Sequence, residues 1–192
     1  MENSNITSLK GKGFKLVPVS KEYIEVLHSW ECDISTKYLW TIDKEVISRE
    51  EYENNFLGKL ESKYHAFFVI LNFEEKPIGF ICSHDVSISD GYAFITAYIS
   101  EGNQNLGIGA KVGILFFDYL FSYYPFRKIY CDVFEYNEAT LSSLKHGGFK
   151  VEGTFNEHRY YKGRYHTMYR LALYREDYYN KFQDMISRVI SK

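Results

Sequence analysis

The chain has 192 residues, 45% of them apolar, which is enough for one domain with a sizeable core. Its net charge of −2 gives no reason to expect a nucleic-acid partner. No stretch approaches the ~18 apolar residues of a membrane span, and the polar start lacks a signal-peptide region. Three cysteines without metal or redox spacing favour a reducing, cytoplasmic setting without a metal ion.

The first predicted elements are a strand and two helices that follow a flexible N-terminal tail of residues 1–12. Residues 14–19 have the pattern of a strand, and residues 20–30 have helical spacing of apolar side chains. A second helix is predicted over residues 45–60, with an acidic first turn that suits a helix N-terminus. No linker or repeat divides the rest, so residues 13–192 are expected to form a single domain.

Strands dominate the middle and the end of the chain. Apolar or alternating runs predict strands over residues 66–71, 78–83, 92–99, 128–134, 150–161 and 164–174. Helices are predicted from Ile108 to just before Pro125, over residues 138–146, and over residues 176–190.

The most informative segment is Gln-Asn-Leu-Gly-Ile-Gly-Ala at residues 104–110, between a predicted strand and an apolar helix. The first N–H groups of a helix lack intrahelical partners and attract phosphates, and glycines let a ligand approach the backbone. A P-loop would need Lys and Ser or Thr where Ile108 and Gly109 stand, and a dinucleotide loop would need Gly at Val112. The segment therefore predicts a different kind of phosphate site, with an ordinary strand-to-helix turn as the alternative.

The same segment, read as Gln-x-x-Gly-x-Gly and followed by a helix that opens at Asn137, resembles the GNAT superfamily of acyl-CoA N-acyltransferases. Residues 137–149 are similar to that family's Asn…Gly-Phe segment. The residues that follow resemble the branch of ribosomal-protein N-terminal, spermidine and amino-sugar acetyltransferases. The resemblance implies an α/β (α+β) fold with a mixed, largely antiparallel sheet, splayed between its fourth and fifth strands and flanked by helices.

The resemblance also implies that acetyl-CoA is the co-substrate and lies in the opening of the sheet. In the family, backbone groups hold the thioester and the pyrophosphate. The cofactor-binding residues implied here are Tyr98, Ile99, Gln104, Asn105, Leu106, Gly107, Ile108, Gly109, Ala110 and Asn137.

The group that protonates the leaving sulfur departs from the common family pattern. Many members carry a Tyr seven residues after the Asn, and this position is Leu144 here. The resemblance leaves Ser142 or Ser143 as candidates for this catalytic role. The alternative for both is a solvated or back-bonded helix serine.

The base that accepts the amine proton is equally open, because the predicted strand 92–99 has no carboxylate. His84 is the favoured catalytic candidate, since imidazole titrates near neutral pH. The other candidates are Asp85, Glu135, Glu152 and Glu157, or a water chain to bulk solvent.

The acceptor pocket is expected between the first two helices and the last two strands, with Trp30, Trp40 and Tyr165 as substrate-binding candidates. Core packing or a polar hairpin surface is the alternative for these side chains. The sequence predicts an enzyme, active as a monomer or homodimer, that moves an acetyl group from acetyl-CoA to a primary amine. The amine belongs to a protein N-terminus or a small molecule.

Transfer is expected to occur by direct attack in a ternary complex, because Cys82 and Cys131 lie in predicted strands, a poor setting for a reactive thiolate. The alternative is a non-catalytic CoA-binding or sensor module on the same fold.

Overall fold

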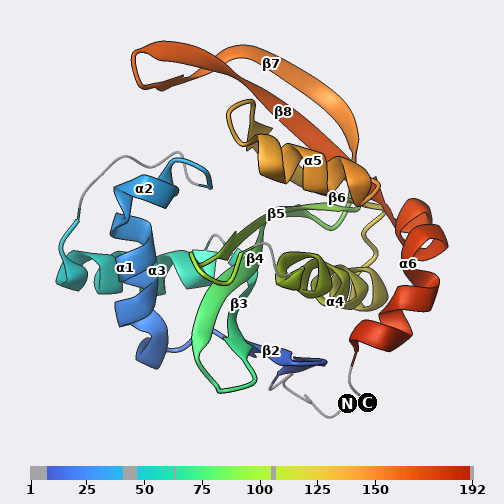
Figure 1. The fold of residues 1–192 in the computed structure, drawn as a ribbon, viewed down its shortest axis with the longest axis horizontal. Coiled ribbons are helices and arrows are strands. Elements are labelled where there is room, and N and C mark those ends of the chain that lie inside the picture. The colour runs from blue at the N-terminus through green and yellow to red at the C-terminus, as the bar shows by residue number, and fades with distance from the viewer. Residues whose placement is uncertain (1–7, 41–46, 63, 105–106, 191–192) are drawn as a thin grey trace.

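A computed structural model describes residues 8–40, 47–62, 64–104 and 107–190. Eight strands form one sheet in the order β1-β2-β3-β4-β5-β6-β8-β7 (Figure 1). The strands are β1 (Leu9–Gly11), β2 (Phe14–Pro18), β3 (Tyr64–Asn72), β4 (Pro77–Ser87), β5 (Tyr92–Ile99), β6 (Lys128–Phe134), β7 (Lys150–Tyr161) and β8 (Arg164–Tyr174). The helices are η1 (Lys21–Tyr23), α1 (Ile24–Cys32), α2 (Ile34–Lys37), α3 (Arg49–Ser62), α4 (Ile108–Tyr123), α5 (Glu138–His146) and α6 (Arg175–Val189).

The sheet opens between β5 and β6, the parallel pair in an otherwise antiparallel set of described strands. These two strands pair at three positions, of which the last is Phe94 with Tyr130. Beyond it, β5 continues to Ile99 and β6 to Phe134 without pairing. The predicted fold class, with its splay between the fourth and fifth predicted strands, is therefore confirmed.

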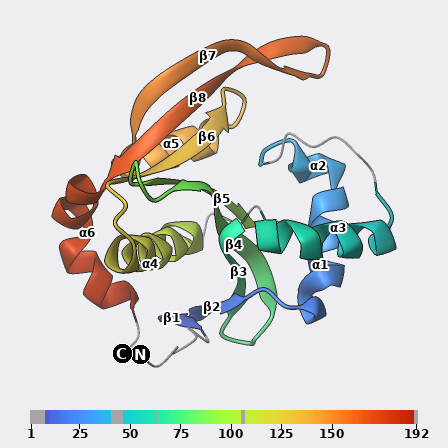
Figure 2. The same cartoon turned by 180° about the vertical axis from the view of Figure 1, so that it is seen from behind.

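Helices cover the two faces of the sheet unequally (Figures 1 and 2). On one face, α4 carries the centre of the main core, and residues of both halves of the sheet pack on it together with α5 and α6. On the other face, α1 and α3 cover a smaller aromatic core over the N-terminal half. The β7–β8 hairpin projects from the C-terminal half on the same side of the molecule as α2.

The expected tail of residues 1–12 needs correction at its second half. Leu9–Gly11 forms β1 and pairs with β2, and Gly11 also bridges to Ile190. Gly13 has a φ of 87°, which permits the tight turn between the two strands. Residues 1–7 lie outside the described residues.

The helices of the N-terminal half also begin differently from the prediction. The first starts as the 3-10 turn η1, where the Ser20 hydroxyl donates to Glu22 and caps no backbone N–H. The helix predicted over residues 45–60 is α3, which begins at Arg49, with Ser48 Oγ accepting from the Glu51 N–H at 3.1 Å. The short α2 was not predicted. Asp33 caps it by accepting from the Ser35 N–H at 2.9 Å.

Among the described residues, no helix is both long and apolar enough to cross a membrane.

Candidate active site

Hydrogen bonds fix the end of β5 to β4 and to the loop that leads into α4. Gln104 Nε2 donates to the Ile99 carbonyl at 2.8 Å, and the Ser100 N–H donates to the Ile78 carbonyl at 2.8 Å. Gly107 then starts α4 in the left-handed region, with a φ of 70° and no side-chain cap. The first turn of α4 therefore has backbone N–H groups that no side chain of the N-cap residue satisfies.

The space around this helix start is open. Among the described residues, a Cβ on Gly107 would meet nothing within 4 Å, and one on Gly109 would approach only Ile99 Cγ1, at 3.7 Å. An uncapped helix N-terminus with open space beside it fits a phosphate group. Of the other implied cofactor-binding residues, Ile108 and Ala110 lie in the first turn of α4, whereas Asn105 and Leu106 lie outside the described residues.

A second helix N-terminus lies on the other side of the opening, where β6 leads into α5. The Asn137 side chain accepts from the Thr140 N–H at 3.3 Å, so Asn137 caps α5. Its Nδ2 also donates to the Leu39 carbonyl at 3.4 Å. Asn137 thus joins α5 to the segment after α2.

Ser142 and Ser143 lie on the exposed side of α5. The Ser142 carbonyl accepts from His146 Nδ1 at 2.8 Å. Leu144, at the position of the family's tyrosine, packs against the main core instead. A role for either serine as the acid stays a prediction.

His84 lies within a chain of three polar side chains that ends on β5. Its Nδ1 is 2.7 Å from Asp85 Oδ2, and its Nε2 is 3.1 Å from Thr96 Oγ1. Asp85 has a φ of 45° and lies at a β-bulge, where the register between β4 and β5 shifts. Bulges re-aim side chains, and here the bulge turns the carboxylate back toward the imidazole. The sequence analysis named both residues as candidate bases but did not predict that they pair. Their adjacency in the sequence was the signal that could have indicated the pairing.

Glu152 is poorly suited to accept a proton. It accepts hydrogen bonds from Lys128 Nζ at 2.8 Å, from the Tyr130 hydroxyl at 2.7 Å, and from the Tyr174 hydroxyl. Desolvation alone would raise the pKa of Glu152, but these donors outweigh it and lower the pKa to about 2. The group therefore links three strands as a fixed anion.

The remaining carboxylate candidates are also accounted for. Glu135 Oε1 lies 2.8 Å from His166 Nδ1, and this contact lowers the pKa of Glu135. Glu157 is exposed on β7. Among the candidate bases, His84 is the one that the structure connects to the strand implied to hold the thioester.

Two of the three predicted substrate-binding residues meet at the end of β5. The Trp30 and Trp40 rings lie 5.5 and 5.7 Å from the buried Tyr98 ring, and Trp40 also packs edge-on against Phe80 at 5.2 Å. Tyr165 lies elsewhere, 61% exposed on the hairpin. The structure thus brings Trp30, Trp40 and Tyr98 together and leaves Tyr165 apart.

The β7–β8 hairpin contacts the segment after α2. Tyr38 stacks on Tyr161 at 4.7 Å, and the Tyr136 hydroxyl donates to the Tyr38 carbonyl at 3.0 Å. Desolvation raises the pKa of Tyr136 to about 12, so its hydroxyl remains a donor. Residues 38–39 therefore connect to the C-terminal half of the sheet on the face that carries Tyr98.

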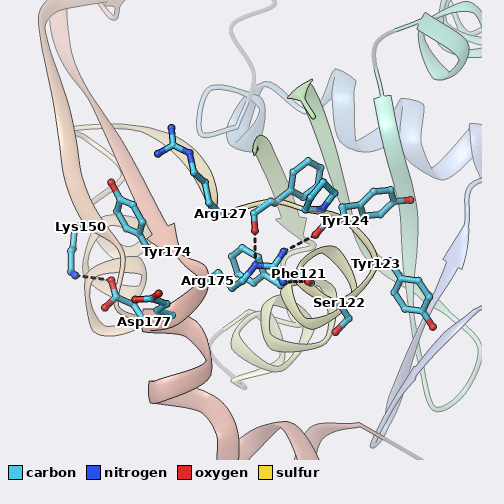
Figure 3. A pocket seen from close by; sticks show the side chains of 12 residues that line it. Phe121, Ser122, Tyr123, Tyr124, Arg127, Lys150, Tyr174, Arg175 and Asp177 are labelled. Atoms are coloured by element: carbon cyan, nitrogen blue, oxygen red, sulfur yellow. Dashed lines mark hydrogen bonds and ion pairs between the residues drawn. The ribbon is translucent and has the colours of Figure 1, made fainter. Parts of the chain in front are cut away.

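A hollow of about 930 Å³ lies at the far end of α4 from Gly107 (Figure 3). Arg175 donates there to three backbone carbonyls, including those of Tyr124 at 2.6 Å and Phe126 at 2.7 Å. Lys150 pairs with Asp177 at 2.6 Å. Arg175, Lys150 and Asp177 thus make structural contacts, and the hollow contains none of the predicted site residues.

The fold and the family comparison together define an acyltransferase enzyme. Residues 21–169 match the family model described as acetyltransferase (GNAT) domain. The chain therefore belongs to the GNAT acetyltransferase family. No curated protein sequence matches it.

Solved structures share the fold at low sequence identity. Spermidine N-acetyltransferase from Vibrio cholerae, in complex with CoA and spermine, is 18% identical with a TM-score of 0.81, over 87% of this chain and 98% of that chain. A dodecameric structure of spermidine N-acetyltransferase from the same organism is 19% identical with a TM-score of 0.77, over 88% of this chain and 98% of that chain.

Proposed function

We propose that the enzyme transfers an acetyl group from acetyl-CoA to a primary amine of a small molecule, within a ternary complex. The observation that carries this proposal is the helix start at Gly107, uncapped and open, beside strands that diverge after three paired positions. The N–H groups at this start would hold the pyrophosphate, and the free edge of β5 near Tyr98 and Ile99 would hold the thioester arm. Asn137 would contact the arm from the opposite side.

His84 is the proposed base for the acceptor amine. Asp85 fixes the imidazole through Nδ1, and Nε2 reaches Thr96 on β5, two residues from Tyr98. The amine proton would pass to the imidazole through the Thr96 hydroxyl or through water. A base that is oriented by a carboxylate and reaches the reacting strand has the arrangement that general-base catalysis requires.

In the transfer step, the amine nitrogen forms a bond to the acetyl carbonyl carbon and the carbon–sulfur bond breaks. The amine proton leaves toward His84, and the CoA thiolate takes up a proton. An acyl-enzyme has no support on Cys131, because burial raises the pKa of this thiol to about 12. Direct attack on the thioester is therefore the proposed route.

A small amine is favoured as the acceptor because residues 38–39 connect to Tyr136 and Asn137 across the divergent strands. Aromatic side chains dominate the adjoining face. The solved relatives named above are spermidine acetyltransferases, which supports a small-molecule acceptor over a protein N-terminus.

The proposal is tested by calorimetric titration with acetyl-CoA and with CoA, followed by a thiol-release assay over primary amines. The panel includes spermidine, glucosamine and a peptide with a free N-terminus. Binding with turnover on a small amine is expected. Absence of acetyl-CoA binding would overturn the cofactor site. Turnover on the peptide alone would overturn the acceptor class.

A further inference from the structure

Among the described residues, three side chains have buried polar atoms without a hydrogen-bond partner, and one of them is Ser83 on β4. The other two are hydrogen-bond donors that flank the opening of the sheet. They are the Trp40 indole Nε1 and the Arg159 guanidinium, of which Nε and Nη1 are buried. Indole and guanidinium nitrogens only donate hydrogen bonds. A buried donor that is left unpaired is unfavourable, so such a group in a native protein requires an explanation.

Arg159 is 7% exposed on β7, and its guanidinium carbon lies 4.6 Å from the centre of the Phe134 ring. Its cross-strand neighbour is His166, whose ring nitrogens contact Glu135 and the Tyr161 carbonyl. The nearby anion is therefore already engaged by His166. The Arg159 charge lies over the Phe134 ring and forms no ion pair with a described carboxylate.

The two donors lie on the same face of the sheet, on opposite sides of the opening. Phe94 and Tyr130 are the last paired residues of β5 and β6, and their rings stack at 5.0 Å on that face. Side chains alternate along a strand, so Tyr98 and Phe134 share this face at the unpaired ends. Trp40 packs on Tyr98 and Arg159 packs over Phe134.

A ligand that satisfies both donors must supply hydrogen-bond acceptors. The planar guanidinium group can donate two parallel hydrogen bonds to a pair of oxygens of a carboxylate or a phosphate. A polyamine ends in ammonium groups, which offer only donors and repel the Arg159 charge. The geometry therefore favours an acceptor molecule with an anionic group at some distance from its reactive amine.

We propose that the acceptor is an amine that also carries an anionic oxygen group, a carboxylate or a phosphate, which Arg159 binds and to which Trp40 Nε1 donates. The inference rests on the proposed transfer to a small amine. It names the class of acceptor and identifies Arg159 as the residue that determines specificity.

The test compares matched amines in the thiol-release assay. Lysine and 1,5-diaminopentane differ by the carboxylate, and glucosamine 6-phosphate and glucosamine differ by the phosphate. The wild type is expected to favour the anionic member of one pair in kcat/KM by about 10- to 100-fold, which is the range of a charge-assisted hydrogen bond. The pair that shows this preference identifies the anion.

Two variants connect the preference to the proposed residues. Arg159→Met is expected to remove the preference by lowering kcat/KM for the anionic amine alone. Trp40→Phe keeps an aromatic ring, loses Nε1, and is expected to reduce the preference in part. Arg164→Met, an exposed arginine on the same hairpin, is the matched control and is expected to change nothing. Calorimetry with acetyl-CoA checks that each variant retains its cofactor site.

Equal kcat/KM within both pairs, or a preference for the neutral members, would overturn the inference and leave the acetyl-transfer proposal intact. Equal losses on both members in Arg159→Met would also overturn it, because they would show a structural role. Absence of acetyl-CoA binding in the wild type would instead mark failure of the proposed function. If acetyl-CoA binds and no amine reacts, calorimetry of the CoA complex with lysine and with glucosamine 6-phosphate decides whether an anionic amine binds. Binding of neither compound would overturn the inference.

Discussion

At the scale of single residues, Gly107 is the residue on which the proposed phosphate site at the start of α4 depends. We predict that Gly107→Leu weakens acetyl-CoA binding by more than about tenfold, because the new side chain fills the open space beside the helix N-terminus. A left-handed residue with a side chain also costs about 1–2 kcal/mol of stability. Calorimetry with acetyl-CoA and thermal denaturation measure the two effects.

Gly13 supplies the matched control for this substitution. It has a φ of 87° and nothing within 4 Å of its Cβ position, but it lies in the turn between β1 and β2. Gly13→Leu should therefore lose similar stability and keep its acetyl-CoA affinity. Equal affinity in both variants would show that the helix start does not bind the cofactor.

The second residue-scale prediction concerns His84. His84→Gln should lower kcat/KM by about 10²–10⁴-fold, because glutamine cannot accept the amine proton. Asp85→Asn should give a smaller loss, since it disturbs the orientation of the ring through Nδ1. Thiol release with a reactive amine measures both losses.

His158, exposed on β7, is the control for this prediction. His158→Gln should keep the wild-type kcat/KM. A His84→Gln enzyme with an unchanged kcat/KM would assign the proton to a water chain instead.

At the scale of elements, the sequence was most informative where a pattern is local. The strand ranges 92–99, 128–134, 150–161 and 164–174 and the helix range 138–146 agree with the structure, because alternating or periodic runs end there at turn residues. The segments β1 and α2 were missed, because three or four residues are too short to show a period.

The candidate site likewise has features that are local in the sequence and features that are not. The glycine loop was visible because its residues are neighbours in the chain. Trp40 and Arg159 are far apart in the sequence, and only the divergence of β5 and β6 places them on two sides of one opening. Unsatisfied buried donors have no sequence pattern, so this feature required the structure.

Glu152 supplies a prediction at the element scale, because it links β6, β7 and β8 through Lys128, Tyr130 and Tyr174. Its pKa is lowered from 4.5 to about 2, so its stabilising contribution is complete above the unfolded value and is lost as the pH falls from 4.5 toward 2. We expect a loss of about 1–2 kcal/mol in this window, after allowance for screening at a partly exposed site.

Urea denaturation between pH 5 and pH 2 tests this expectation in the wild type and in Glu152→Gln. The variant should start less stable and should lose less stability on acidification. Glu157→Gln on the same strand is the control and should follow the wild type. Parallel acid profiles in all three proteins would refute the linkage.

At the scale of the whole molecule, the hydrophobic core joins the two halves of the sheet, which pair with each other at three positions of β5 and β6. Leu16 and Ile70 of the N-terminal half and Ile129 of the C-terminal half share one cluster with Phe116 of α4 and Tyr178 of α6. The Lys12 N–H also donates to the Val189 carbonyl at 2.9 Å, so both ends of the folded chain meet. Packing on the helices therefore holds the two halves of the sheet together where β5 and β6 do not pair.

This arrangement predicts that the chain unfolds as the single domain expected for residues 13–192. Tyr178 is fully buried on α6, and its hydroxyl donates to the Ile114 carbonyl at 2.8 Å. Tyr178→Ala should cost about 3–5 kcal/mol through the cavity that it leaves. Trp30 and Trp40 lie in the N-terminal half, so tryptophan fluorescence reports on a region distant from the substitution.

In urea, the fluorescence midpoint and the far-ultraviolet circular dichroism midpoint should coincide in the wild type and should shift together in Tyr178→Ala. Tyr178→Phe, which loses only the hydroxyl, should shift both by a smaller and equal amount, about 1 kcal/mol. A fluorescence midpoint that stays at the wild-type value while the circular dichroism midpoint falls would mean that the halves unfold independently. The opening between β5 and β6 would then be a boundary between two folding units, and acetyl-CoA would bind across that boundary.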